Sequence, residues 1–213
     1  MAGENTTHFL FVLRAAGRFC DYNDEAVKRR RSVTERQAAY LELLVLRCQR
    51  GRREALEELV RMWEKRLFYY IRRLVDDEHV AWQVLQETWV KVLQGIGKLR
   101  TPTCLPSWLY RIARNTAVSH LRGKYRDDLA RSEDAGRPDV DTGAADFAVE
   151  DVEQVHYGLS RLSLRHREVL TLFFLQDLSI REIGDVLGVS EGAVRSRLYH
   201  AKRALRNVLE ETE

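Results

Sequence analysis

The sequence predicts an all-α protein in which a flexible acidic linker joins two small helical domains. Three observations lead to this prediction. The 213 residues include only 3 prolines and 12 glycines, fewer than a fold with many turns requires. Apolar side chains recur every three or four residues through two segments, 37–126 and 155–213. Between them, residues 127–154 carry ten acids and two arginines, a net charge of −8 in a chain whose overall charge is +3.

Composition excludes several other classes of protein. No apolar run approaches the roughly 20 residues that cross a bilayer, so no membrane insertion is expected. The 3 cysteines are far apart and form no C-x-x-C pair, which argues against a disulfide framework or a zinc site and favours a reducing cytoplasm. No basic segment precedes the apolar stretch near the N-terminus, so no secretory signal is predicted. Residues 1–36 are expected to form a disordered N-terminal extension, which ends at a capping box, Thr34-x-x-Gln37.

The first domain, 37–126, is expected to hold four helices. The third should span about 77–94, and the fourth should open at Pro106-Ser107 and end at Arg126. This fourth helix carries arginine and lysine but not one acid, and its apolar residues occupy the opposite face. The polar face holds Arg111, Asn115, Ser119 and Arg122, with Arg114 beside it. Such a face suits phosphates and base edges, although a basic face that only meets solvent fits the same pattern.

The second domain, 155–213, is expected to contain a winged-helix-like helix-turn-helix. Ser179-Ile-Arg-Glu182 is a capping box that opens a short helix, Gly188 ends it, and Ser190 caps a long last helix. The basic residues of that last helix are Arg195, Arg197, His200, Lys202, Arg203 and Arg206. This composition is typical of a helix in the DNA major groove, but many helical hairpins are basic without binding DNA.

Two strings resemble a single protein family. The run Ser107-Trp-Leu-Tyr-Arg-Ile-Ala-Arg-Asn115 is similar to region two of bacterial RNA polymerase sigma factors, in the extracytoplasmic-function class of the sigma-70 family. The segment 86–92 resembles the preceding helix, which docks on the polymerase clamp, and 178–198 resembles region four. This sequence departs from the family at Trp82-Gln83, where an acidic pair is usual, and at Gly184, where alanine is usual. Glycine and alanine are both expected to be small enough for the helix crossing at Gly184.

The resemblance implies a sigma factor that binds core RNA polymerase and directs promoter recognition, DNA melting and transcription initiation. The first domain would bind core polymerase and the melted minus-ten element, and the second would bind the duplex minus-thirty-five element. The residues expected to contact polymerase are Gln83, Gln86, Glu87 and Lys91. Minus-ten contacts fall to Trp108, Arg111, Arg114, Asn115, Ser119 and Arg122, beside a base pocket in the loop 98–105; Trp108 is equally expected as a core residue. Minus-thirty-five contacts fall to Gly192, Ala193, Arg195, Ser196, Arg197, Tyr199, His200 and Lys202.

Other functions remain open at this point. A helix-turn-helix activator or repressor would bind duplex DNA without replacing a sigma factor. An enzyme is not expected, because the chain has no Walker loop, H-E-x-x-H, G-x-S-x-G or G-x-G-x-x-G. No cofactor and no metal are predicted, and an anti-sigma factor is left open as a further partner. The acidic linker could imitate nucleic acid in a polymerase channel or serve only solubility.

Overall fold

The computed structural model describes residues 35–75, 77–131 and 150–210, and every regular element in these ranges is helical, which confirms the all-α prediction. The first domain consists of α3 (Glu35–Gln49), α4 (Arg53–Leu74), α5 (Glu78–Gly95), two short 3-10 turns, η2 (Ile96–Lys98) and η3 (Pro102–Cys104), and α6 (Leu105–Arg131). The second consists of α7 (Glu150–Arg161), α8 (Leu164–Leu170), a π-helical turn η4 (Thr171–Leu175), α9 (Ile180–Leu187) and α10 (Glu191–Glu210). No helix in the described ranges is long and apolar enough to cross a membrane.

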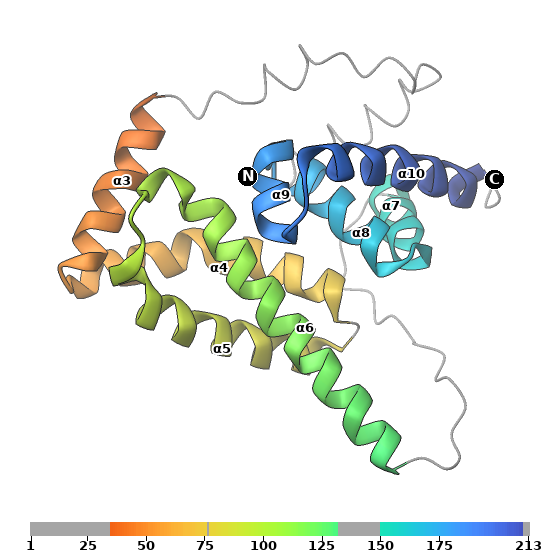
Figure 1. Ribbon diagram of the computed structural model, residues 1–213, viewed down its shortest axis with the longest axis horizontal. Coiled ribbons are helices and arrows are strands. Elements are labelled where there is room, and N and C mark those ends of the chain that lie inside the picture. The colour runs from red at the N-terminus through yellow and green to blue at the C-terminus, as the bar shows by residue number, and fades with distance from the viewer. Residues whose placement is uncertain (1–34, 76, 132–149, 211–213) are drawn as a thin grey trace.

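The first domain is a helical bundle around α4. Figure 1 shows α4, α5 and α6 packed together with α3 across one end. The buried residues of α4 recur at three- and four-residue steps and form its core face: Ala55, Leu59, Trp63, Leu67, Tyr70, Ile71 and Leu74. Asp77 caps α5 by accepting a hydrogen bond from the backbone N–H of Val80 at 3.0 Å, so this helix begins where the sequence predicts.

The second domain contains the predicted helix-turn-helix. The Ser179 hydroxyl accepts from the Glu182 backbone N–H at 3.1 Å, and the Glu182 carboxylate accepts from the Ser179 backbone N–H at 2.8 Å. Gly188 ends α9 with a φ of 68°, in the left-handed region that glycine adopts at little cost. Ser190 caps α10 by accepting from the Ala193 backbone N–H at 3.3 Å. Residues 150–210 include no strand, so the likeness to a winged helix stops at the helix-turn-helix.

Gly184 stands where α9 turns closely onto the start of α10. A Cβ added to Gly184 would lie 2.9 Å from the Val189 carbonyl oxygen. This distance is too short for a carbon beside a backbone oxygen, so the backbone would have to shift. The expectation that alanine and glycine fit this crossing equally well is therefore wrong. An alanine at position 184 would require a backbone shift that glycine does not.

The helices next to the acidic segment are longer than predicted. Helix α6 continues to Arg131, and α7 begins at Glu150, so both enter the segment 127–154 that was expected to be linker. The sequence has no glycine or proline between Lys124 and Ala135, so nothing stops α6 at Arg126. Acids at 150, 151 and 153 also favour a helix start, because they interact well with the N-terminal end of the helix dipole. Helix α3 begins at Glu35, two residues inside the expected extension 1–36. The expected disorder of 1–34 and the expected flexibility of 132–149 lie outside the described residues.

The turn η4 follows α8 directly and carries the chain to the first domain. The Gln176 backbone N–H donates to the Thr171 carbonyl at 3.1 Å, five residues back, which makes this turn one residue wider than an α-helical turn. Gln176 is 5% exposed, and its side-chain oxygen accepts hydrogen bonds from Tyr110 of α6 and from Arg66 of α4. Arg66 also donates to the Gln176 carbonyl at 3.1 Å. The wide turn therefore directs Gln176 into the contact between the two domains.

His156 of α7 makes a second contact between the domains. Its Nδ1 lies 2.9 Å from the Arg73 guanidinium and its Nε2 lies 3.1 Å from the Tyr69 hydroxyl, both on α4. Because Arg73 can only donate, Nδ1 accepts and the ring proton belongs on Nε2. Burial, and then the Arg73 charge, lower the pKa of His156 from 6.5 to about 4. The imidazole is therefore neutral at pH 7 in this arrangement.

Candidate nucleic-acid interface

The outer face of α6 brings together most of the predicted minus-ten residues. Arg111, Asn115, Ser119 and Arg122 are all exposed and lie along one side of the helix, as their spacing predicts. Trp108 begins the same side but is half-buried and packs on the core; its ring lies 3.0 Å from the position of a Cβ on Gly95. Its packing matches the core alternative, and the residue as a whole is only partly buried.

Arg114 is separated from these residues. Its guanidinium Nε donates to the Glu168 carboxylate of α8 at 2.8 Å, and the Arg114 side chain is 26% exposed. The sequence places Arg114 beside the polar face of α6 but carries no signal for this partner, which stands 54 residues further along the chain. In the structure Arg114 therefore belongs to the contact between the domains.

The loop between α5 and α6 is held by a residue that the sequence analysis missed. The Gln49 amide, at the end of α3, donates to the Ile96 carbonyl at 3.0 Å and to the Leu99 carbonyl at 2.8 Å. At the other end of the loop, the Ser107 hydroxyl donates to the Cys104 carbonyl at 3.1 Å. These bonds fix the backbone of the predicted base pocket next to the polar face of α6. A single glutamine at a helix end has no periodic partner, so no pattern in the sequence distinguishes it.

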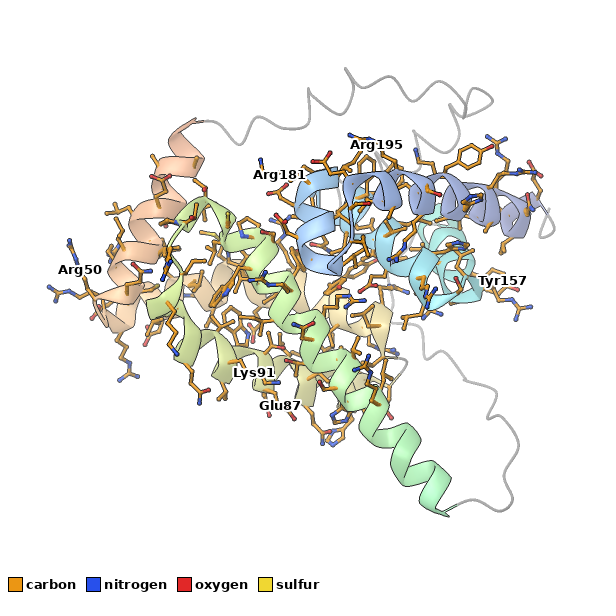
Figure 2. All side chains as sticks on the ribbon, viewed as in Figure 1. Arg50, Glu87, Lys91, Tyr157, Arg181 and Arg195 are labelled. Carbon is orange, nitrogen blue, oxygen red and sulfur yellow. The ribbon has the colours of Figure 1, made fainter. Side chains whose placement is uncertain are left out.

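The outer face of α5 carries the predicted polymerase contacts. Gln83, Gln86, Glu87 and Lys91 are all exposed. Figure 2 shows Glu87 and Lys91 on the outside of the first domain, where their charged groups lie 3.9 Å apart. The same face includes apolar side chains that the predicted set lacks, namely Trp82, Val90 and Leu93, which are 42%, 52% and 50% exposed. The Trp82 ring stacks on the Phe68 ring, with their centroids 4.2 Å apart. This face therefore presents an aromatic surface at the position where the family usually has an acidic pair.

Helix α10 presents its predicted minus-thirty-five residues outward. Gly192, Arg195, Ser196, Tyr199 and His200 are exposed, and Ala193 and Arg197 are half-buried. Figure 2 shows Arg195 on the side of α10 that faces away from the first domain.

The charged groups of Arg195 and Lys202, two of the predicted minus-thirty-five residues, contact other residues of the chain. Arg195 pairs with Glu191 at 3.1 Å on the exposed surface, a contact that DNA can displace at small cost. Lys202 differs, because its ammonium lies 5.9 and 5.6 Å from the ring centroids of Phe173 and Phe174, and burial lowers its pKa. Lys202 therefore lies at the edge of the recognition face, against its own domain.

Comparison with known proteins assigns both halves of the chain. Residues 59–127 match the family description Sigma-70 region 2, and residues 153–205 match Sigma-70, region 4. The chain is 32% identical over 182 residues to the RNA polymerase sigma-H factor of Pseudomonas aeruginosa, an alignment that covers 78% of this chain and 92% of that protein. The chain belongs to the sigma-70 family of RNA polymerase sigma factors. It is also 33% identical over 149 residues to the extracytoplasmic-function sigma factor SigL of Mycobacterium tuberculosis, covering 68% of this chain and 83% of SigL.

Solved structures show the same fold. This sigma factor superposes on the sigma factor RpoE of Bartonella quintana, crystallised with the anti-sigma factor NepR, with a TM-score of 0.64 at 21% identity. The match covers 72% of this chain and 96% of RpoE. The resemblance drawn from the sequence, to the extracytoplasmic-function class of this family, is confirmed.

Proposed function

We propose that this sigma factor binds core RNA polymerase, directs it to promoters, helps to melt the DNA and so starts transcription. The observation that carries the proposal is the presence of region two and region four in one chain, each with its polar, basic helix face exposed. An activator or repressor needs only the helix-turn-helix, and nothing in that function accounts for a region-two bundle. The family consists of initiation factors that do not themselves catalyse a reaction, and we propose no active site in this chain.

Each face has a distinct part in this proposal. The α10 face would read the duplex minus-thirty-five element through arginine contacts to base edges and phosphates, with the backbone at Gly192 close to a phosphate. The α6 face and the adjoining loop would hold the unpaired minus-ten strand, whose bases expose edges and π-faces that a duplex hides. The outer face of α5 would dock on the polymerase.

The proposal also includes an anti-sigma partner and a cellular compartment. RpoE of Bartonella quintana was crystallised with an anti-sigma factor, and we propose that a partner of this kind controls the present chain as well. Its action belongs in the cytoplasm, where core polymerase and promoter DNA are found. No cofactor has a part in it.

A reconstituted transcription assay tests the proposal. The chain should co-elute with core polymerase and start transcription at defined sites that core polymerase alone does not use. A variant with Gln86 and Glu87 both changed to alanine should lose co-elution while it keeps the helical content of the parent. Tight, specific binding of the free chain to duplex DNA, without co-elution, would instead establish the activator or repressor function.

A further inference from the structure

The two domains meet through a buried carboxylate. Glu168 of α8 is 4% exposed, and its Oε1 accepts from Arg114 at 2.8 Å and from the Tyr70 hydroxyl at 2.9 Å. Both donors belong to the first domain. An ionised carboxylate that leaves water needs such donors, because an unpaired buried charge costs several kcal/mol. In the docked form, donors of the first domain therefore compensate the charge of Glu168.

Two further features, the Tyr70 hydroxyl and the hydrogen bonds to Gln176, stabilise this contact between the domains. Burial, and then Glu168, raise the pKa of Tyr70 well above its ordinary value, so the hydroxyl stays protonated and continues to donate. The bonds from Arg66 and Tyr110 to Gln176 lie in the same contact and fix the approach of η4 to α4 and α6. Figure 1 shows α8 and α9 against α4 and α6, where these residues are placed.

Arg114 has two competing partners in this arrangement. The resemblance to region two implies that Arg114 contacts the melted minus-ten strand, which carries phosphates, and the structure pairs Arg114 with a carboxylate. Both groups are anionic oxygen acceptors that a guanidinium binds by charge-assisted hydrogen bonds. We propose that Glu168 competes with the minus-ten strand for Arg114, so that the docked free chain binds melted DNA weakly and binds it well only after the domains separate. This inference rests on the proposed function.

The size of the chain requires that separation when a promoter is bound. The two elements are centred about 25 base pairs apart, which is about 85 Å of duplex at 3.4 Å per base pair. A compact chain of 213 residues has a radius of gyration of only about 17 Å, so the docked form cannot reach both elements. Reading both elements therefore breaks the Glu168 contact and releases Arg114.

The expected effect on affinity follows from the population of the open form. When only a fraction of the chain is competent, the apparent dissociation constant rises by the inverse of that fraction. If the docked form outnumbers the open form by about ten to one, a variant that opens the chain binds single-stranded DNA about tenfold more tightly. Binding of duplex DNA by α10 should not change, since its outer face is exposed in the docked form.

The test uses Glu168→Gln in the full chain, with Glu210→Gln as the matched control. Both variants remove one negative charge from the second domain, but Glu210 is exposed at the end of α10. Affinity for a fluorescent single-stranded oligonucleotide with a minus-ten sequence is measured on the free protein. Energy transfer between dyes on cysteines placed at the exposed positions Arg50 and Asn207 reports domain separation in the same samples.

The proposal expects Glu168→Gln to bind the single strand about tenfold more tightly and to lower energy transfer, while Glu210→Gln changes affinity less than twofold. Adding Arg114→Ala to Glu168→Gln should remove the gain. If Glu168→Gln does not fold, Tyr70→Phe removes one hydrogen bond from the same carboxylate and should give a smaller gain in the same direction. Separated domains without tighter single-strand binding, or a gain that survives Arg114→Ala, would overturn the competition. Transcription by the parent chain is measured independently, so that result leaves the proposed function standing.

Discussion

Gln49→Ala should impair promoter opening although Gln49 is outside every predicted DNA contact. The variant removes two half-buried hydrogen bonds, to the carbonyls of Ile96 and Leu99. Each bond contributes roughly 0.5–1.5 kcal/mol net, and partial exposure favours the lower part of that range. A loss of about 1–2 kcal/mol of loop order corresponds to a factor of about 5–30 in the population of the ordered loop. Capture of an unstacked base requires that ordered backbone, so open complexes should fall by up to this factor.

Permanganate footprinting of the holoenzyme measures the effect. On a fully paired template Gln49→Ala should lower the reactivity of minus-ten thymines, and a template with a pre-melted bubble should recover part of the loss. Gln49→Glu should be worse than alanine, because a carboxylate faces two carbonyl oxygens. Gln94→Ala, at an exposed glutamine of α5, is the matched control and should behave as the parent chain. Equal loss on paired and bubble templates, or unchanged opening with a lower melting temperature, would show that Gln49 only stabilises the domain.

Three further predictions follow from the exposed helices and the domain contact. Asn115→Ala should lower open-complex formation but leave polymerase co-elution and minus-thirty-five binding unchanged, as footprinting and gel filtration can show, because the proposed partner of the α6 face is the unpaired minus-ten strand. Arg197→Ala should cost about 1–3 kcal/mol against the preferred duplex if it pairs with a base, whereas Arg206→Ala should weaken all sequences alike and flatten the salt dependence. Because docking lowers the pKa of His156 from 6.5 to about 4, the docked form binds fewer protons, so docking should weaken as pH falls from about 6.5 towards 4. Solvent screening limits this effect to about 1–2 kcal/mol, and the pH dependence of energy transfer should be absent in His156→Asn.

Local sequence signals predicted the helix-turn-helix closely. The serine at 179 and the glycine at 188 act through residues at most four positions away, so their spacing alone determines the capping box and the left-handed end of α9. The polar face of α6 was predicted for a similar reason, because helical periodicity places Arg111 and Asn115 together.

Contacts between distant residues could not be predicted in this way. Glu168 and Tyr70 are 98 residues apart, and each fits the local pattern of its own helix. Nothing in that pattern shows that the two groups meet across a domain contact, so Arg114 was expected to be available to DNA. The length of α6 was misjudged for another reason: the acidic charge beyond Arg126 indicated a linker, whereas charge alone does not break a helix and no glycine or proline stands there.

The wide turn η4 sets the direction in which Gln176 meets the first domain. A π-helical turn holds one residue more than the α-helical turn it replaces, so deletion of one residue from Thr171–Leu175 would restore a regular helix. Each residue advances an α-helix by about 100°, so Gln176 would rotate away from Tyr110 and Arg66 by about that angle. The capping box and the glycine turn lie downstream and would keep their own internal bonds. Glu168 and His156 precede η4 and would keep their contacts with the first domain, so the deletion would loosen the domain contact at Gln176 alone.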